Sequence, residues 1–276
     1  MKLRGNLDGA SWLAGSFGDE KMEESIKLTD GTVTLRRYRA EDAEPVYLAV
    51  RESIGHMIMG QEINNIERVY DTVAKEYSEA FSDEHEKKPK DQEILRRFSI
   101  EIGDKRPVWD FGCGPGQTAK YLKNLGIEIS GLDLSEKILE QARTIHPEID
   151  FRKGNILELD FDDDSIGGVV AFYAIVHFTE EQVEIAFREA FRVLQPGGLF
   201  LFTYHIGEGT ICIEEFLGKK IDMDFMFFNT DFISSCLKKI GLKKIEIIER
   251  EPYPGVEYES RRAYVFATKP VVGRSP

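Results

Sequence analysis

The sequence of 276 residues has few cysteines and no long apolar run. Its three cysteines (Cys113, Cys212 and Cys236) are odd in number and lack the spacing of metal ligands, so we expect a reducing, cytoplasmic compartment and no metal site. Nowhere do about 18 apolar residues follow one another, which predicts no membrane span and no membrane partner. The opening Met-Lys-Leu-Arg lacks the apolar core of a signal peptide, because Asn6 and Asp8 interrupt it.

Positive charge is also scarce. The chain has 36 lysines and arginines against 49 aspartates and glutamates, a net charge of −13. Non-specific attraction to nucleic acid or anionic lipid is therefore disfavoured, although a local basic groove stays open, and we do not expect a nucleic-acid partner. Hydrophobic content of 42% and charged content of 31% fit a globular protein with one large domain, with or without an appendage. Oligomeric state cannot be read from these features.

Glycines alternate after a short apolar segment near the middle of the chain. Residues 108–116 read Val-Trp-Asp-Phe-Gly-Cys-Gly-Pro-Gly, and a second apolar run further on ends at Asp133. Glycines let the backbone approach a ligand, and the helix that follows directs its free N–H groups into the same crevice. An acid at the tip of the next strand can accept both ribose hydroxyls. A dinucleotide fingerprint would need glycine at position 117, where Gln117 stands.

The string Asp-x-Gly-x-Gly-x-Gly that begins at Asp110 resembles the first motif of class I S-adenosylmethionine-dependent methyltransferases. The resemblance continues through residues 131–143, Gly154-Asn-Ile-Leu-Glu-Leu and residues 192–198, so that four motifs follow in family order. It implies an α/β fold: a Rossmann-like, mostly parallel seven-stranded sheet with helices on both faces and an antiparallel last strand. The cofactor that it implies is S-adenosylmethionine.

The hydrophobic pattern alternates between strands and helices, which predicts a parallel sheet covered on both faces. Strands are predicted near 107–111, 127–132, 149–153, 167–173, 198–204, 242–250 and 261–268. Helices are predicted near 64–81, 91–102, 116–125, 135–145, 179–193 and 230–240. The core thus begins near residue 107, and the two helices before it belong to the same domain.

The methyltransferase resemblance also implies a set of cofactor-binding residues. These are Asp110, Gly112, Cys113, Gly114, Gly116, Asp133, Leu134, Asn155 and Ile156, with Tyr70 and Tyr77 from a preceding helix whose Tyr-Asp-x-x-Ala-x-x-Tyr string resembles the one that folds over the cofactor. Asp110 is expected to hold the loop and the aminoacyl end, Asp133 the ribose, and Leu134 the adenine. In the alternative interpretation Asp110 only caps backbone N–H groups, Gly116 only permits helix packing, and Asp133 is a helix cap that Ser135 could replace.

Asn155 departs from the family pattern, in which an acid commonly accepts a hydrogen bond from the adenine amino group. Asparagine keeps one carbonyl acceptor but loses the charge. Cofactor binding could weaken by about 1 kcal/mol, the difference between a neutral and a charge-assisted hydrogen bond.

Three residues near the ends of two strands are candidates for the methyl-acceptor site and for catalysis. Tyr173 and His177 follow the fourth strand, and His205 ends the fifth, where strands of such sheets face the ligand crevice. His177 is a candidate for shaping the acceptor site, with a structural role as the alternative. His205 has a pKa suited to general base catalysis, with a solvated or helix-capping histidine as the alternative. Residues 206–229 contain methionine and phenylalanine that either wall an apolar acceptor pocket or form a lid helix against the sheet.

The N-terminal part is expected to be an appendage. Residues 1–62 are predicted to be partly disordered, residues 63–270 to form the methyltransferase domain, and residues 271–276 to be a disordered tail. A predicted strand over 32–38 and a helix from Glu41 resemble the opening of a GNAT-superfamily acetyltransferase, but nothing downstream supplies the coenzyme A site of that family.

The resulting hypothesis is a methyltransferase that transfers a methyl group from S-adenosylmethionine to a small-molecule acceptor by in-line displacement. One alternative is a cofactor-binding regulatory or scaffold protein of the same fold without transfer activity. A further alternative is a tRNA-modifying methyltransferase. The acceptor and the atom that is methylated cannot be read from the sequence.

Overall fold

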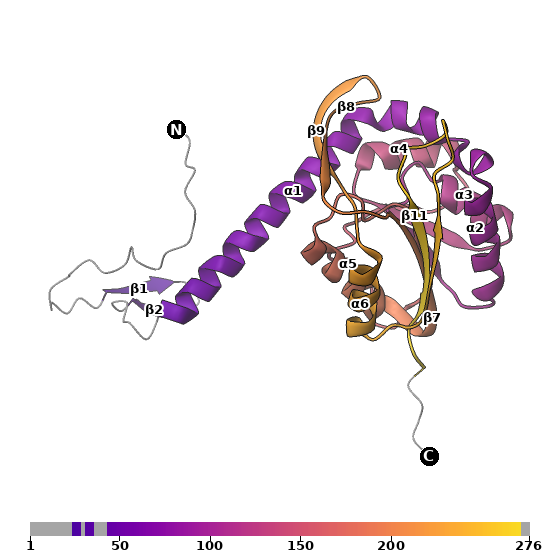
Figure 1. Ribbon diagram of the computed structural model, residues 1–276. Coiled ribbons are helices and arrows are strands. Elements are labelled where there is room, and N and C mark those ends of the chain that lie inside the picture. Colours follow the sequence, from indigo (N-terminus) through magenta and orange to yellow (C-terminus); the bar gives the residue numbers. More distant parts are fainter. Residues whose placement is uncertain (1–23, 29–30, 36–42, 272–276) are drawn as a thin grey trace, which may run out of the picture. The chain divides into compact units, whose positions relative to one another are not determined.

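The computed structural model describes residues 24–28, 31–35 and 43–271 (Figure 1). The chain divides into two compact units between Gly60 and Gln61. Most of what the sequence predicts for the first 25 residues, and for the tail after residue 271, lies outside the described residues.

The first unit contains a strand pair, β1 (Glu24–Leu28) and β2 (Gly31–Leu35), which run antiparallel. The helices predicted from Glu41 and from residue 64 form one continuous helix, α1 (Ala43–Phe81). No proline occurs between positions 45 and 89. The glycine at position 60 costs the helix only about 1 kcal/mol relative to alanine, which explains why it does not end there. The domain boundary after residue 62 and the acetyltransferase likeness stay predictions.

The second unit is built on a seven-stranded sheet in the order β10-β11-β7-β6-β3-β4-β5. Its strands are β3 (Val108–Phe111), β4 (Ile129–Asp133), β5 (Phe151–Lys153), β6 (Ile166–Ala171), β7 (Leu194–His205), β10 (Lys243–Arg250) and β11 (Arg262–Thr268). Neighbours from β5 to β7 are parallel, whereas β11 pairs antiparallel with both β7 and β10. The predicted mostly parallel sheet with an antiparallel last strand is confirmed.

Helices cover both faces of this sheet (Figure 1). The helices are α2 (Pro89–Glu101), α3 (Gln117–Asn124), α4 (Glu136–Ile145), α5 (Glu180–Val193) and α6 (Thr230–Ile240), with the short 3-10 helix η2 (Glu84–Lys87) before α2. Side chains of α2, α3 and α4 pack in one buried cluster with Val108, Val170 and Leu201 of the sheet. On the other face, Phe187 of α5 packs edge-on against Phe200 of β7. The two-sided packing explains why the central strands are apolar at nearly every position.

The parallel register brings several strand ends to one edge of the sheet. Asp110 of β3 lies opposite Gly131 of β4 and Val170 of β6. Since parallel strands end on the same side, the segments after β3, β4, β6 and β7 meet there. This edge holds the site described below.

The region after β7 differs from the prediction of a lid helix. It forms an antiparallel hairpin of β8 (Thr210–Phe216) and β9 (Lys219–Met226). Leu217 and Gly218 both have positive φ at the turn, as two-residue hairpin turns require. Isoleucines at 211 and 213 alternate with polar residues, a period of two that favours a strand over a helix.

No helix in the described part of the chain is long and apolar enough to cross a membrane.

Candidate functional site

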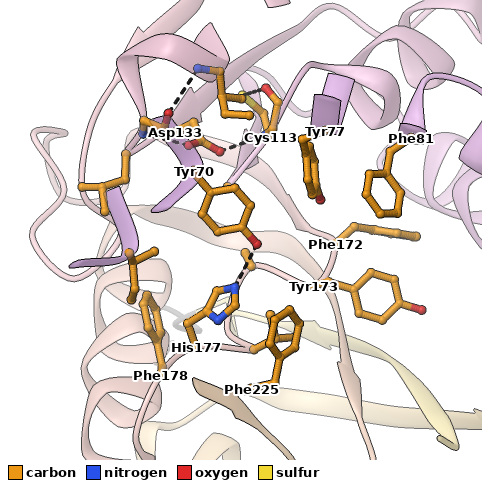
Figure 2. A pocket seen from close by; sticks show the side chains of 18 of the residues that line it. Tyr70, Tyr77, Phe81, Cys113, Asp133, Phe172, Tyr173, His177, Phe178 and Phe225 are labelled. Atoms are coloured by element: carbon orange, nitrogen blue, oxygen red, sulfur yellow. Dashed lines mark hydrogen bonds between the residues drawn. The ribbon is translucent and has the colours of Figure 1, made fainter. Parts of the chain in front are cut away.

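A cavity of about 480 Å³ opens at the carboxyl ends of the parallel strands. The segments after β3, β4, β6 and β7 line it, together with α1, the β8–β9 hairpin and the loop between β10 and β11. Every residue that the sequence predicts for the site contributes to this lining except Asp110 and Gly116. Figure 2 shows Asp133 and Cys113 at one end of the group drawn, and Tyr173 and Phe225 further away.

The three glycines of the elbow after β3 are needed for two different structural reasons. All have positive φ, from +53° to +87°. A Cβ at Gly112 would lie 2.6 Å from Cβ of Ala174, and one at Gly116 would lie 2.6 Å from the ring of Phe151. At Gly114 the nearest atom would be 3.7 Å away, on Tyr77. Gly112 and Gly116 therefore serve packing and Gly114 faces the cavity, so the packing interpretation of Gly116 fits the geometry.

Asp133, at the end of β4, is held by two backbone N–H groups. Its Oδ2 accepts from Gly114 at 2.9 Å, and its Oδ1 accepts from Ser135 at 3.0 Å. The cap of α4 is Ser135, whose Oγ accepts from Ile138 N, so the helix does not need Asp133 as its cap. Burial raises the pKa of Asp133 and the backbone hydrogen bonds oppose this. A carboxylate has about four acceptor positions, so each oxygen can still accept a hydroxyl from a ribose.

Two acceptor atoms near the elbow find no hydrogen-bond partner within residues 59–271. They are Oδ2 of Asp110 and Oε1 of Gln117, both buried. Burial raises the pKa of Asp110 well above its usual range, the charge of Asp133 adds to this, and a backbone hydrogen bond from Ala119 opposes it. Buried acceptors without donors are costly, so a positively charged or N–H-bearing group fits between the elbow and Gln117.

Apolar side chains form a slot beside Asp133. Leu134 and Ile156, both predicted, line the cavity together with Ile138 and Phe178, which the sequence reasoning did not single out. The Oδ1 of Asn155 accepts a hydrogen bond from Leu157 N at 3.0 Å. One lone pair of this amide oxygen is thus engaged within the chain, and only the other is available to an amino group.

Tyr70 and His177 are joined by a hydrogen bond of 2.8 Å between the tyrosine hydroxyl and Nε2 (Figure 2). The Nδ1 of His177 lies 2.8 Å from the carbonyl oxygen of Asp224 in β9. A carbonyl can only accept, so Nδ1 carries the proton and Nε2 accepts from Tyr70. Burial lowers the pKa of His177 to about 4, so the ring is neutral at pH 7. The contact connects α1, the segment after β6 and the hairpin.

Tyr173 and His205 lie together at another part of the cavity, with ring centroids 5.1 Å apart. Tyr173 has a φ of +54°, which is rare for a residue with a side chain and is found at functional sites. The Nδ1 of His205 lies 2.7 Å from Oγ of Ser260. Burial, with the positive charges of Arg262 and Lys88, lowers the pKa of His205 to about 3. His205 is therefore a much weaker base than its ordinary pKa suggests.

Polar contacts fasten α1 over the cavity. Oδ1 of Asp71 accepts from Oγ of Ser135 at 2.6 Å and from Lys137 N at 3.1 Å. Asn65 donates to the carbonyl oxygen of Asp222 in β9 at 2.8 Å. Asp71 follows Tyr70 directly, so its attachment to α4 fixes where Tyr70 enters the cavity.

Sequence reasoning did not single out Glu84 and Lys88, and for Glu257 and Arg262 it favoured a solvated charge cluster over an anion clamp. Glu84, Lys88, Glu257 and Arg262 all line the cavity, although they come from opposite ends of the domain. Lys88 and Arg262 are buried in the structure, at 6% and 2% exposed, and no local sequence pattern indicates this burial. Glu257 and Arg262 look like an ordinary surface charge cluster in the sequence.

Comparison with known proteins supports the same interpretation of the core. Residues 109–202 match the family model described as a methyltransferase domain. The core is similar to S-adenosylmethionine-dependent methyltransferases. A relative from Mycolicibacterium smegmatis, described as a probable enzyme of this kind, is 38% identical over 96 residues, which are 35% of this chain and 37% of that protein. An uncharacterized methyltransferase of Oceanobacillus iheyensis is 30% identical over 148 residues, 53% of this chain and 62% of that protein.

The chain thus spans less than two thirds of the length of these two relatives. Among solved structures, a phosphoethanolamine N-methyltransferase 2 of Haemonchus contortus superposes with a TM-score of 0.59 at 21% identity, covering 76% of this chain and 60% of that chain. This likeness shows a shared fold. Together the comparisons show that residues 109–202 are similar to methyltransferase domains and that the core shares the fold of a solved methyltransferase.

Proposed function

We propose that the protein transfers a methyl group from S-adenosylmethionine to a small-molecule acceptor by in-line displacement. The observation that carries this proposal is that one cavity joins the glycine elbow and Asp133 to an aromatic region around Tyr70 and His177. Bound S-adenosylmethionine supplies an electrophilic methyl carbon on a sulfonium leaving group. The chain's own residues then have to bind, align and exclude water.

The residues present fit this cofactor. Asp133 keeps acceptor positions for two ribose hydroxyls, and the apolar slot of Leu134 and Ile156 suits adenine. Oε1 of Gln117, which lines the cavity and has no partner among the described residues, suits the ammonium of the aminoacyl end, and Asp110, outside the lining, is proposed to hold the loop. The rings of Tyr70 and Tyr77, 5.4 Å apart, present aromatic surface that attracts a sulfonium charge. These assignments are proposals.

Tyr70 is proposed to contact the acceptor, with His177 as a positioning residue. Nε2 of His177 accepts a hydrogen bond from the Tyr70 hydroxyl. The lone pairs of the phenolic oxygen therefore stay available to accept a hydrogen bond from an O–H or N–H of the methyl acceptor. A histidine with a pKa near 4 is a weak base at pH 7, so alignment contributes more than proton removal. The same argument applies to His205, the sequence-based candidate for a general base, because its pKa is lowered to about 3, so a positioning role is proposed for both histidines.

The coverage of the cavity favours a small acceptor over tRNA. Phe216 and Phe225 of the hairpin contact Tyr77 and His177, with ring centroids 6.2 and 4.5 Å apart. A nucleotide within a folded RNA would have to displace these contacts. The cytoplasmic location stays a prediction.

Isothermal titration with S-adenosylmethionine tests the cofactor site, and no heat at high micromolar cofactor would contradict it. Transfer is tested by incubating the protein with methyl-labelled cofactor and the low-molecular-mass fraction of a cell extract. Label should move to a small molecule, together with formation of S-adenosylhomocysteine. Cofactor binding without any transfer would favour the regulatory or scaffold alternative.

Tyr70→Phe then tests the alignment role. It should lower kcat about tenfold or more while the cofactor affinity stays within about twofold, because only a hydroxyl facing the acceptor is lost. Tyr121→Phe removes a tyrosine hydroxyl outside the cavity and should change neither value. Equal kcat for Tyr70→Phe and Tyr121→Phe would show that the Tyr70 hydroxyl has only a structural role.

A further inference from the structure

Three cations converge on one carboxylate at the end of the cavity beyond Tyr173. Arg250 forms a bidentate pair with Glu257, Arg262 Nε lies 2.9 Å from Oε2 of Glu257, and Lys88 Nζ lies 3.4 Å from the same oxygen. The side chains of Lys88, Arg250, Arg262 and Glu257 are at most 9% exposed. Buried charges of this kind are expensive unless they are paired, so their arrangement is specific.

Two donors at this end lack a hydrogen-bond acceptor among the described residues. They are the hydroxyl of Tyr173 and Nε of Arg262, both buried. Arg262 is close enough to Glu257 for an ion pair, but its Nε–H does not point at the oxygen, so the guanidinium fork is only partly used. Both residues line the cavity, and Lys88 Nζ lies 5.6 Å from the centre of the Tyr173 ring.

The unpartnered polar groups at the two ends of the cavity therefore differ in hydrogen-bonding character. Near the elbow, the cavity-lining group left without a partner in the described structure is an acceptor, Oε1 of Gln117. Beyond Tyr173 the cavity-lining residues left with an unpartnered group, Tyr173 and Arg262, offer donors, whereas the unpartnered acceptor there, Oδ2 of Asp91, belongs to a residue outside the lining. Figure 2 shows the Tyr173 hydroxyl directed away from His177, so it faces away from the Tyr70–His177 pair. A ligand group at this end has to accept hydrogen bonds.

On the basis of the proposed function, we propose that the methyl acceptor carries an oxyanion, preferably a carboxylate, bound at the Tyr173 end by Arg262, Tyr173 and Lys88. Its reacting atom lies near Tyr70. A planar carboxylate matches the guanidinium fork and a neighbouring O–H donor. The apolar and aromatic lining between the two ends, from Phe172 and Phe225, suits an aromatic or hydrocarbon body.

The charge of the cluster selects carboxylate over phosphate. Lys88, Arg250 and Arg262 are balanced by Glu84, Glu257 and Asp91, so the cluster is formally neutral. Binding then depends on the direction of N–H and O–H groups, and each further negative charge on the ligand is uncompensated. Of these residues, Lys88 and Arg262 line the cavity together with Glu84 and Glu257, whereas Arg250 and Asp91 do not.

The experiment uses the full chain saturated with S-adenosylhomocysteine and four probes: benzoate, benzamide, phenyl phosphate and benzyl alcohol. Titration calorimetry or ligand-observed NMR gives their relative affinities. Benzoate should bind about tenfold more tightly than benzamide or benzyl alcohol, and more tightly than phenyl phosphate. Failure of S-adenosylhomocysteine to bind would defeat the proposed function, whereas equal binding of benzoate and benzamide to the loaded protein would defeat only this inference.

Two variants locate the site. Tyr173→Phe should weaken benzoate binding about tenfold and leave benzamide unchanged, because it deletes one donor to the anion. Arg262→Lys keeps the positive charge but loses the planar pair of N–H donors of the guanidinium, and it should also weaken benzoate binding. Tyr121→Phe, outside the cavity, is the matched control and should bind as the wild type does.

Each remaining outcome is decisive. If Tyr173→Phe and Arg262→Lys bind S-adenosylhomocysteine normally and also bind benzoate as the wild type does, the carboxylate lies elsewhere and the proposal is wrong. Tighter binding of phenyl phosphate than of benzoate would overturn the choice of carboxylate. Should either variant fail to fold, the wild-type comparison of benzoate with benzamide still decides whether the cavity prefers an anion.

Discussion

The two ends of the cavity are built in different ways. The cofactor end consists largely of backbone: the elbow at Gly112–Gly114 and the N–H groups that hold Asp133 come from two adjacent strand ends. The acceptor end consists of side chains from α1, the hairpin, the segment after β6 and the loop before β11. A backbone site depends on a few glycines in sequence, whereas a side-chain site depends on tertiary packing.

The largest effect is expected at the elbow. Gly112→Ala places a Cβ 2.6 Å from Ala174 at a φ of +69°, so it should destabilise the fold by about 4 kcal/mol and abolish cofactor binding. Gly126→Ala is the matched control, with a φ of +87° and open space around the new Cβ. It should cost only about 1 kcal/mol. Urea unfolding measures both, and equal losses would show that strain alone, without close packing, governs Gly112.

The acceptor end should make the protein sensitive to acid. His177 and His205 have pKa values lowered by burial to about 4 and about 3, against 6.5 when unfolded. Between these values the unfolded chain binds more protons, so stability is complete above about pH 6.5 and falls as the pH drops toward 4. The loss should reach about 3 kcal/mol for each histidine. Denaturant unfolding from pH 7.5 to 4 measures it.

His177→Gln provides the internal control for this pH dependence. It keeps an acceptor and a donor but cannot titrate, so the loss of stability between pH 6.5 and 4 should shrink by roughly half. A variant curve parallel to that of the wild type would mean that His177 does not titrate in this window.

At the cofactor end, Asp133→Asn should weaken binding of S-adenosylmethionine about tenfold to a hundredfold. One oxygen becomes an amide nitrogen, which cannot accept from both backbone N–H groups and the ribose. Asp150→Asn, an exposed change just before β5, should leave the affinity unchanged. Titration calorimetry measures the cofactor affinity of both variants. Normal binding by Asp133→Asn would mean that Asp133 only supports the loop.

The smallest effect concerns the hairpin. Lys219 pairs with Glu76 of α1 at 2.9 Å, but both side chains are more than a third exposed. Lys219→Ala should change stability by less than about 0.5 kcal/mol and cofactor affinity by less than about twofold. Phe225→Ala, which removes the ring packed on His177, should have a larger effect on stability than Lys219→Ala. The reverse order would show that the ion pair, and not aromatic packing, holds the hairpin over the cavity.

The predictability of the site follows the same division. Gly112, Gly114 and Asp133 could be found because strand ends that are adjacent in the sheet carry recognisable motifs within about 25 residues of sequence. The hairpin was predicted as a helix or an apolar wall, because its phenylalanines and methionines suited either. Lys88 has no local signal, and the charged stretch around Arg262 favours a solvated cluster over an anion clamp, since charged residues are expected on the surface.

The sequence by itself determined the alternating strands and helices, the sheet with its antiparallel last strand and the elbow beside Asp133. Local periodicity and glycine conformation suffice for these, because neighbouring residues decide them. Only the tertiary structure decided that the hairpin covers the cavity beside α1, and that Arg262 and Lys88 meet beyond Tyr173. Those contacts join residues more than 100 positions apart, and their energies depend on burial, which no short stretch of sequence contains.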